Sequence, residues 1–179
     1  MSRSLTNRDQ AILRRVASSL PAGAPGRAAL VGLSKTSRVD IQVILEAHAL
    51  WLSGRGGMQA DLSGLDLEGA NLRGANLQEA LLKKTLLTRA NLQGANLRGA
   101  NLTGAFMTAA DLRRADLTNA EAAYAKMSFV KFDGAILTGL YVYHTDLSYA
   151  DLSGTDPRGL DFSTVAREGT IFPSHWSKF

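Results

Sequence analysis

The chain contains 179 residues, of which 45% are hydrophobic, has a formal net charge of +4 and contains no cysteine. The lack of cysteine excludes disulfides, thiolate metal sites and a cysteine nucleophile. No run of 18 apolar residues is present, so we expect no membrane span. The polar opening MSRSLTNRDQ lacks the apolar run of a signal peptide, which makes the cytoplasm the expected location.

The N-terminal region, residues 1–58, is expected to be helical. Thr6 and Asp9 have the spacing of a capping box, and the apolar periodicity that follows predicts a helix over about residues 7–20. Pro21 would end this helix, because proline cannot continue it.

A second helix is predicted after a linker over residues 21–36. It starts after Ser37 and Asp40 and covers about residues 38–53. Its apolar side carries Val43, Ile44, Ala47, Leu50 and Trp51. We expect this helix to cap the open end of the domain that follows, with Trp51 over the exposed core. A free recognition helix is the alternative.

A five-residue pattern runs without a break from Ala60 to Phe172. The centre of each repeat is usually apolar and the residue two before it is usually small: 14 of 23 centres are Leu, and 14 of the 23 small positions are Ala. A period of five fits neither a helix face nor a strand. It indicates a solenoid in which every fifth residue turns inward.

The pattern A-(D/N)-L-x-x is clearest in ANLQGANLRGANLTGA, residues 90–105, and resembles the pentapeptide-repeat family over residues 60–172. The resemblance implies an all-β solenoid, a right-handed quadrilateral β-helix of nearly six coils over residues 59–172. The centre and the small residue would point inward, and the other three residues outward. At a ladder spacing of roughly 4.8 Å the rod would be on the order of 27 Å long.

The C-terminal tail, residues 173–179, is expected to close the other end of the β-helix. The aromatic residues available for this are Phe172, Trp176 and Phe179. By the resemblance, they could instead form a tail-to-tail dimer, as in some family members. Pro157 and Arg167 occupy centre positions, so we expect the last coil and a half to be loosened, with Arg167 turned outward.

Function is expected on the outward positions, because the interior is structural. Coils of twenty residues would place apolar and aromatic residues on two adjacent faces. The tyrosine face presents Leu81, Tyr124, Tyr141, Tyr143 and His144, with Lys83 and Lys84. The phenylalanine face presents Leu86, Phe106, Phe129 and Tyr149, with Arg89. We call the nine Leu, Phe, Tyr and His residues the aromatic stripe and interpret it as a protein interface. Cover by the first helix of the same chain is the alternative.

No motif indicates catalysis or metal binding. His48, His144 and His175 show no ligand spacing, and no phosphate-binding or dinucleotide-binding loop is present. The Asp residues before the centres are interpreted as supports of the turns. We therefore expect a protein that is not an enzyme and uses no metal or cofactor. It would be a scaffold or adaptor that binds another protein, or itself as a homodimer.

Two alternative functions are kept. Protection or inhibition of DNA gyrase or topoisomerase by DNA mimicry, known for some family members, needs a strongly acidic rod. Residues 60–172 hold eleven Lys or Arg against thirteen Asp or Glu, which is nearly neutral. Nucleic-acid binding would use the basic residues 1–59, which hold eight Lys or Arg against three Asp or Glu. No binding motif supports it, so we expect no nucleic-acid partner.

Overall fold

The computed structural model describes Ser18 and residues 41–176. Three parts of the predictions fall outside the described residues: the helix over residues 7–20, apart from Ser18, the linker over residues 21–36, and Phe179.

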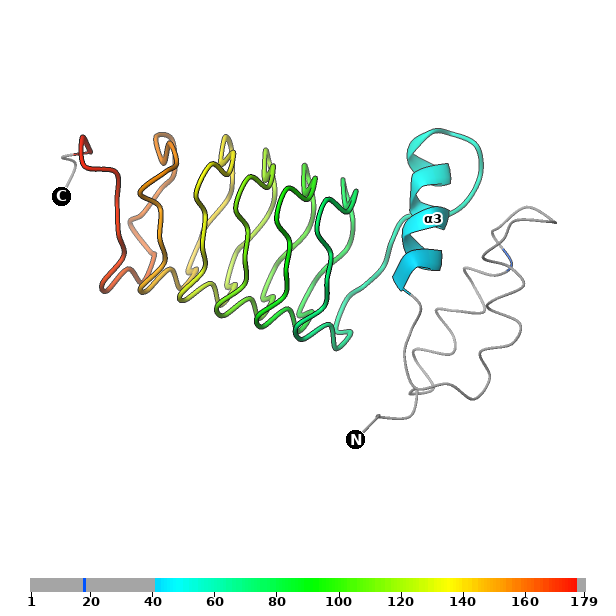
Figure 1. The fold of residues 1–179 in the computed structure, drawn as a ribbon, viewed down its shortest axis with the longest axis horizontal. Helices are drawn as coiled ribbons and strands as arrows, with labels where there is room; N and C mark the ends of the chain where they lie inside the picture. Colours follow the sequence, from blue (N-terminus) through cyan, green and yellow to red (C-terminus); the bar gives the residue numbers. More distant parts are fainter. Residues whose placement is uncertain (1–17, 19–40, 177–179) are drawn as a thin grey trace. The chain divides into compact units, whose positions relative to one another are not determined.

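The described residues belong to two compact units, which meet in the sequence between Asp61 and Leu62. The first unit contains helix α3, Ile41–Leu52, inside the range predicted for the second helix (Figure 1). Its buried side chains are Val43, Ile44, Ala47 and His48, and its half-buried ones include Leu50 and Trp51. The role of this helix as a cap stays a prediction. Among the described residues, no helix combines the length and the apolar character that crossing a membrane requires.

The loop after α3 folds back onto the helix. The N–H of Met58 donates to the carbonyl of Ala47 at 3.1 Å. Nδ1 of His48 accepts a hydrogen bond from the N–H of Ala60 at 3.1 Å, so this nitrogen carries no proton. The His48 ring also stacks on Trp51, with 5.6 Å between the ring centroids. These contacts fix the segment that leaves the helix.

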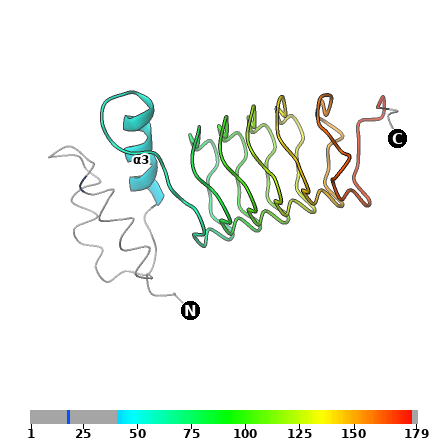
Figure 2. The same ribbon diagram turned by 180° about the vertical axis from the view of Figure 1, so that it is seen from behind.

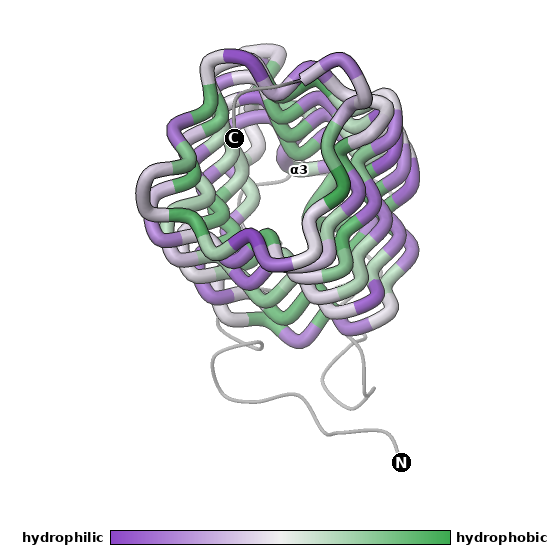
Figure 3. The backbone as a smooth tube through the Cα atoms, turned by 90° about the vertical axis from the view of Figure 1, so that its left-hand side faces the viewer, coloured by the Kyte–Doolittle hydropathy of each residue, from purple (hydrophilic) through white to green (hydrophobic). Residues whose placement is uncertain are grey.

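The second unit is a stack of coils that follow one another along the chain (Figures 1 and 2). Parallel bridges join residues twenty apart, from Asp66 with Leu86 to Asp151 with Ile171. A repeat of five residues in a coil of twenty gives four sides, and a view along the stack shows this four-sided outline (Figure 3). The unit is therefore a quadrilateral β-helix, as the resemblance to the pentapeptide-repeat family implies.

Except around Pro157, neighbouring coils are joined by backbone hydrogen bonds on every side. The N–H of the centre Leu97 donates to the carbonyl of Asp116 at 2.7 Å, and the N–H of Asn96 donates to the carbonyl of Ala75 at 3.0 Å. A third bond, from the N–H of Ala100 to the carbonyl of Leu97 at 3.0 Å, closes the turn at the corner. Each coil thus bonds to the coil before it and to the coil after it, as in other solenoids.

The interior consists of the two inward rows that the repeat predicts. Leu97 and Ala100 are fully buried, and the same holds for most centres and small positions from Ala60 to Leu152. Burying one Leu side chain stabilises the fold by about 1.5–3 kcal/mol. Where Thr85 replaces the small Ala, its buried hydroxyl donates to the carbonyl of Leu62 at 2.8 Å, so no buried polar group is left without a partner there.

The residue two after a centre, which we call the corner position, adopts a positive φ in most repeats. Glycine occupies many corners, for example Gly94 with φ of 66°. Ten corners nevertheless carry a residue with a side chain, at φ between 51° and 60°. Each such residue costs roughly 1–2 kcal/mol relative to glycine.

The last coil departs from this regularity around Pro157. The bridges expected from Ile136 to Asp156 and from Tyr141 to Asp161 are absent, whereas the other two sides keep theirs. Pro157 itself is buried at its centre position. The loosening is therefore confined to two of the four sides.

The prediction that Arg167 turns outward is wrong. The residue is half-buried, and its Nη1 atom is buried. The aliphatic part of an Arg side chain can pack along apolar surface, which allows such a residue to be partly buried. At the end of the rod, Phe172 and Trp176 pack on Phe162, with centroid distances of 5.6 Å and 5.3 Å to the Phe162 ring.

Candidate functional site on the outer faces of the coils

The aromatic stripe lies on the outside of the second unit. Its six Phe and Tyr side chains are 39–55% exposed, and His144 is also exposed. Leu81 and Leu86 are half-buried and therefore less exposed than the aromatic residues. The candidate interface is therefore aromatic, with the two Leu residues as minor contributors.

Four residues of the tyrosine face form one cluster across two coils. The ring of His144 lies 4.3 Å from that of Tyr143 and 5.5 Å from that of Tyr124, measured between centroids. Tyr141 extends the cluster by stacking on Tyr143 at 6.1 Å. Aromatic pairs at such distances stabilise their arrangement by about 0.5–1.5 kcal/mol beyond area burial. The cluster is therefore a preformed surface.

The phenylalanine face carries a second stack, along the corner row. Phe129 and Tyr149 stack at 5.0 Å with 8° between the ring planes. The hydroxyl of Tyr149 donates to Oε1 of Glu168 at 3.1 Å, and this hydrogen bond raises the pKa of the tyrosine. Gly169 lies next in the row, and a Cβ there would come within 2.5 Å of the Tyr149 ring. The glycine thus leaves the room that the ring occupies.

Leu81, Leu86 and Phe106 stand apart from these two groups. Leu86 is bridged to Phe106, one coil further along the same face, and Leu81 is bridged to Asn101. No ring contact joins Phe106 to another described residue. The structure therefore brings six of the nine predicted residues into two clusters and leaves three as separate apolar positions.

Four of the aromatic residues occupy strained corner positions. These are Tyr124, Phe129, His144 and Tyr149, with φ of 60°, 60°, 51° and 59°. Positive φ is unfavourable for a bulky residue, and such strain is often retained at functional sites. Glycine serves the same position elsewhere in the rod, so the fold alone does not require these rings.

We expect Phe129→Gly to leave the free energy of unfolding within about 1 kcal/mol of the original chain. The lost stacking on Tyr149 is offset by the relief of the positive φ. Phe129→Ala is the matched control, because it removes the ring but keeps a Cβ at the positive φ, and it should destabilise the chain more than Phe129→Gly does. Denaturant unfolding of both variants measures this, and equal losses would contradict the role given to the backbone.

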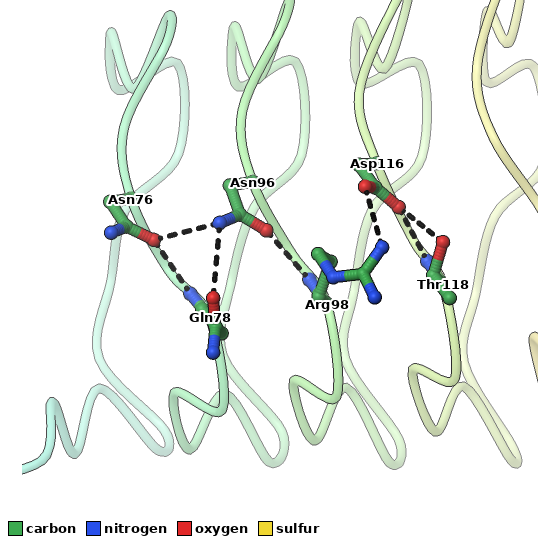
Figure 4. Close-up of polar contacts among 6 residues, drawn as sticks. All are labelled: Asn76, Gln78, Asn96, Arg98, Asp116 and Thr118. Atoms are coloured by element: carbon green, nitrogen blue, oxygen red, sulfur yellow. Dashed lines mark hydrogen bonds and ion pairs between the residues drawn. The ribbon is translucent and has the colours of Figure 1, made fainter. Parts of the chain in front are cut away.

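The two other faces are polar. On the face that carries Asn76, Asn96 and Asp116, side chains of successive coils contact one another (Figure 4). Nδ2 of Asn96 donates to Oδ1 of Asn76 at 3.1 Å, and Nη1 of Arg98 donates to Oδ2 of Asp116 at 3.1 Å. Asp116 also accepts the backbone N–H of Thr118 at 2.9 Å. At most Asn and Asp residues that precede a centre, the side-chain oxygen likewise accepts the backbone N–H of the residue two later. These residues therefore do support the turns.

Sequence reasoning missed two exposed apolar residues on the polar faces. Ile136 and Ile171 are 49% and 54% exposed, at positions where the repeat usually has Asp or Asn. The presence of Ile where the repeat usually has Asp or Asn is the sequence signal that could have identified them. They lie in the rows of Asp116 and Asp151, on other sides of the coil than the aromatic stripe, and single exposed apolar residues are common.

The carboxyl of Asp156 is held by Arg158. The Arg158 side chain donates through Nε to Oδ1 at 2.8 Å, and its backbone N–H donates to the same oxygen at 3.1 Å. These hydrogen bonds lower the pKa of Asp156 from 3.8 to about 2. Because the folded-state pKa is lowered, the pair stabilises the fold above about pH 4, and this contribution disappears as the pH falls towards about 2.

An NMR titration of the Asp156 carboxyl should therefore have its midpoint near pH 2. In Arg158→Gln the midpoint should rise towards the ordinary 3.8. Asp161, which is held by the hydrogen bonds of Ser163 instead, serves as the internal control and should titrate unchanged. A midpoint of Asp156 that ignores the substitution would contradict this assignment.

In the part of the chain that the structure describes, no group of three or more His, Asp or Glu residues is arranged to hold a metal ion. His48 is buried in the first unit, whereas His144 and His175 are exposed.

Comparison with known proteins gives matches to one family. A model described as pentapeptide repeats matches residues 58–89, 66–104 and 107–139, with eight copies. No curated protein matches.

Three solved structures illustrate the likeness. A pentapeptide repeat protein from the thylakoid lumen of Arabidopsis thaliana, AT2G44920, is 29% identical with a TM-score of 0.54, over 56% of this chain and 70% of its own. Rfr23 from the cyanobacterium Cyanothece 51142 is 21% identical with a TM-score of 0.61, over 70% and 95%. QnrB1, a plasmid-mediated fluoroquinolone resistance protein, is 20% identical with a TM-score of 0.26, over 65% of this chain and 80% of its own.

Proposed function

Since this chain belongs to the pentapeptide-repeat family, we propose that it is a non-enzymatic scaffold that binds a protein through its aromatic stripe. In this proposal the rod has nearly six right-handed coils, and its two aromatic faces are the binding surface. The partner is another protein or a second copy of the chain. The cytoplasm stays the expected location, on the sequence argument alone.

The observation that carries this proposal is the exposure of six Phe and Tyr side chains on two adjacent faces. Tyr and Phe are enriched at the centres of protein interfaces, where they contribute much of the binding energy. Tyr124, Phe129 and Tyr149 also keep a positive φ that glycine would relieve. A gain in binding is a physical reason to retain them.

The polar faces give less support to DNA mimicry. Mimicry needs a continuous row of unpaired negative charges. Asp111, Asp116 and Asp156 instead form ion pairs with Arg113, Arg98 and Arg158. Nucleic-acid binding by the basic N-terminal region concerns residues that lie largely outside the described ones.

Site-specific photo-crosslinking tests the proposal. A benzophenone amino acid is placed at Phe129 or Tyr141, and at the exposed Thr138 on a polar face as control. The chain is irradiated in the cells from which it comes, and its adducts are identified by mass spectrometry. One reproducible protein adduct from the stripe positions that is absent at Thr138 supports the proposal. No such adduct, or equal adducts at all three positions, overturns it.

A further inference from the structure

We propose that the phenylalanine face pairs two copies of this chain side by side, with their rods antiparallel. This inference rests on the proposed function and names the partner of one of its two faces. It commits to a second copy of the chain, because the face is complementary to itself in charge and in shape.

The self-complementarity lies in the order of residues along the rod. The row that precedes the centres reads Phe106, Lys126, Asp146 and Ala166, each one coil after the last. A two-fold axis that crosses the face midway between Lys126 and Asp146 reverses this row in the second copy. Lys126 then lies opposite Asp146 of the second copy, and Asp146 lies opposite its Lys126. The large, 44% exposed Phe106 lies opposite the small, exposed Ala166.

The corner row gives the same result. It reads Ala109, Phe129, Tyr149 and Gly169 at the same spacing. Under the same axis Phe129 lies opposite Tyr149 of the second copy, and Ala109 lies opposite Gly169. Rings that are 54% and 46% exposed in one chain are thereby covered in the pair. One operation therefore matches opposite charges in one row and aromatic rings in the other, which a closed two-fold interface requires.

The two central charges are available for this contact. Lys126 is exposed, and no ion pair joins it to another described residue. Oδ1 of Asp146 accepts the N–H of Ser148 at 3.0 Å, which fixes the carboxylate, and the described residues offer it no ion pair either. Opposite charges set the orientation and the register of an interface.

The next face provides a matched control. Lys131 and Asp151 occupy the same places in the repeat and are bridged in the same way. Their corner row, however, carries Gly134 and Gly154 instead of rings. This face has the charges without the stacked aromatic rings, so it should not pair.

The test uses size-exclusion chromatography with light scattering on the full chain. The original chain should have about twice the 19.1 kDa mass of one copy. Lys126→Asp and Asp146→Lys should each have the mass of one copy, because each places like charges opposite one another twice. An equimolar mixture of the two should return to the double mass, because every contact then joins opposite charges. The double variant K126D/D146K should also pair with itself.

The control variants Lys131→Asp and Asp151→Lys should keep the double mass at the same concentration. They create the same repulsion within one rod, so they separate an effect on folding from an effect on pairing. Circular dichroism melting of all variants completes this comparison. The inference is overturned if the original chain has the mass of one copy, or if pairing survives both Lys126→Asp and Asp146→Lys.

The crosslinking experiment distinguishes failure of this inference from failure of the proposed function. If the original chain has the mass of one copy and position 129 crosslinks to a different protein, the pairing is overturned and the scaffold proposal stays intact. If the chain has the mass of one copy and no adduct forms, both are overturned. An adduct between Phe129 and a second copy at the segment around Tyr149 supports both and fixes the antiparallel register.

Discussion

Leu97→Asp is expected to leave the chain unfolded at 25 °C. Leu97 is fully buried and has coils on both sides, to which it is joined through hydrogen bonds of its own backbone and that of its neighbours. A carboxylate at this position finds no water and no cation, which costs several kcal/mol on top of the lost Leu burial. Such a cost is comparable with the whole stability of a small domain, about 5–15 kcal/mol. The far-ultraviolet circular dichroism spectrum and its thermal transition measure the result.

Ile136→Asp is the control for this experiment. It introduces the same residue, but at a 49% exposed position where Asp116 stands one coil earlier. The new carboxylate can remain in water and accept the N–H of Thr138, as Asp116 accepts that of Thr118. We expect a change in stability of less than about 1 kcal/mol. Comparable melting temperatures for the two variants would disprove the assignment of inward and outward positions.

Gly57→Ala is expected to release the loop that follows α3. A Cβ at Gly57 would collide with the carbonyl oxygen of Ala47 and would lie 2.8 Å from Cβ of Leu50. The residue also has a φ of 76°, which adds strain of about 1–3 kcal/mol to the collision. The hydrogen bond from Met58 to Ala47 should open as a result. If the collision and the strain together destabilise the closed loop by about 2 kcal/mol, hydrogen exchange of the Met58 amide should accelerate about thirtyfold.

Gly56→Ala separates the collision from the strain. Gly56 has a φ of 91°, but no atom lies within 4 Å of the added Cβ. This variant should therefore accelerate exchange at Met58 much less than Gly57→Ala does. Amides of the second unit, for example that of Leu97, should exchange at the original rate in both variants, because they belong to the other compact unit. Equal acceleration in the two variants would contradict the packing described for Gly57.

The regular part of the fold could be predicted from the sequence in detail. A strict period of five determines which residues face inward, and Leu97 and Ala100 are buried where the pattern puts them. Bridges between residues twenty apart then place Phe129 beside Tyr149 and Tyr124 beside His144. For the same reason, the two aromatic faces could be written out from the sequence before any coordinates.

The irregular parts could not be predicted in this way, because there the period no longer determines the neighbours. Arg167 stands in the last coil, where only one neighbouring coil constrains a side chain, and its guanidinium is partly buried instead of turned outward. The half-buried state of Leu81 and the hydrogen bond between Tyr149 and Glu168 depend on rotamers and on side chains of adjacent coils. The sequence also does not indicate that the aromatic residues at the corners adopt a positive φ, which the backbone of the structure shows.

Coils of twenty residues made from units of five impose a rule on how this chain can change in length. Inserting one pentapeptide would keep every later centre facing inward, so the interior would survive. The insertion would nevertheless turn everything downstream by a quarter of a circumference. Phe129 and Tyr149, now stacked at 5.0 Å, would lie on different sides if the insertion fell between them. An insertion of twenty residues at the same place would keep both rings on one side, with a further coil between them.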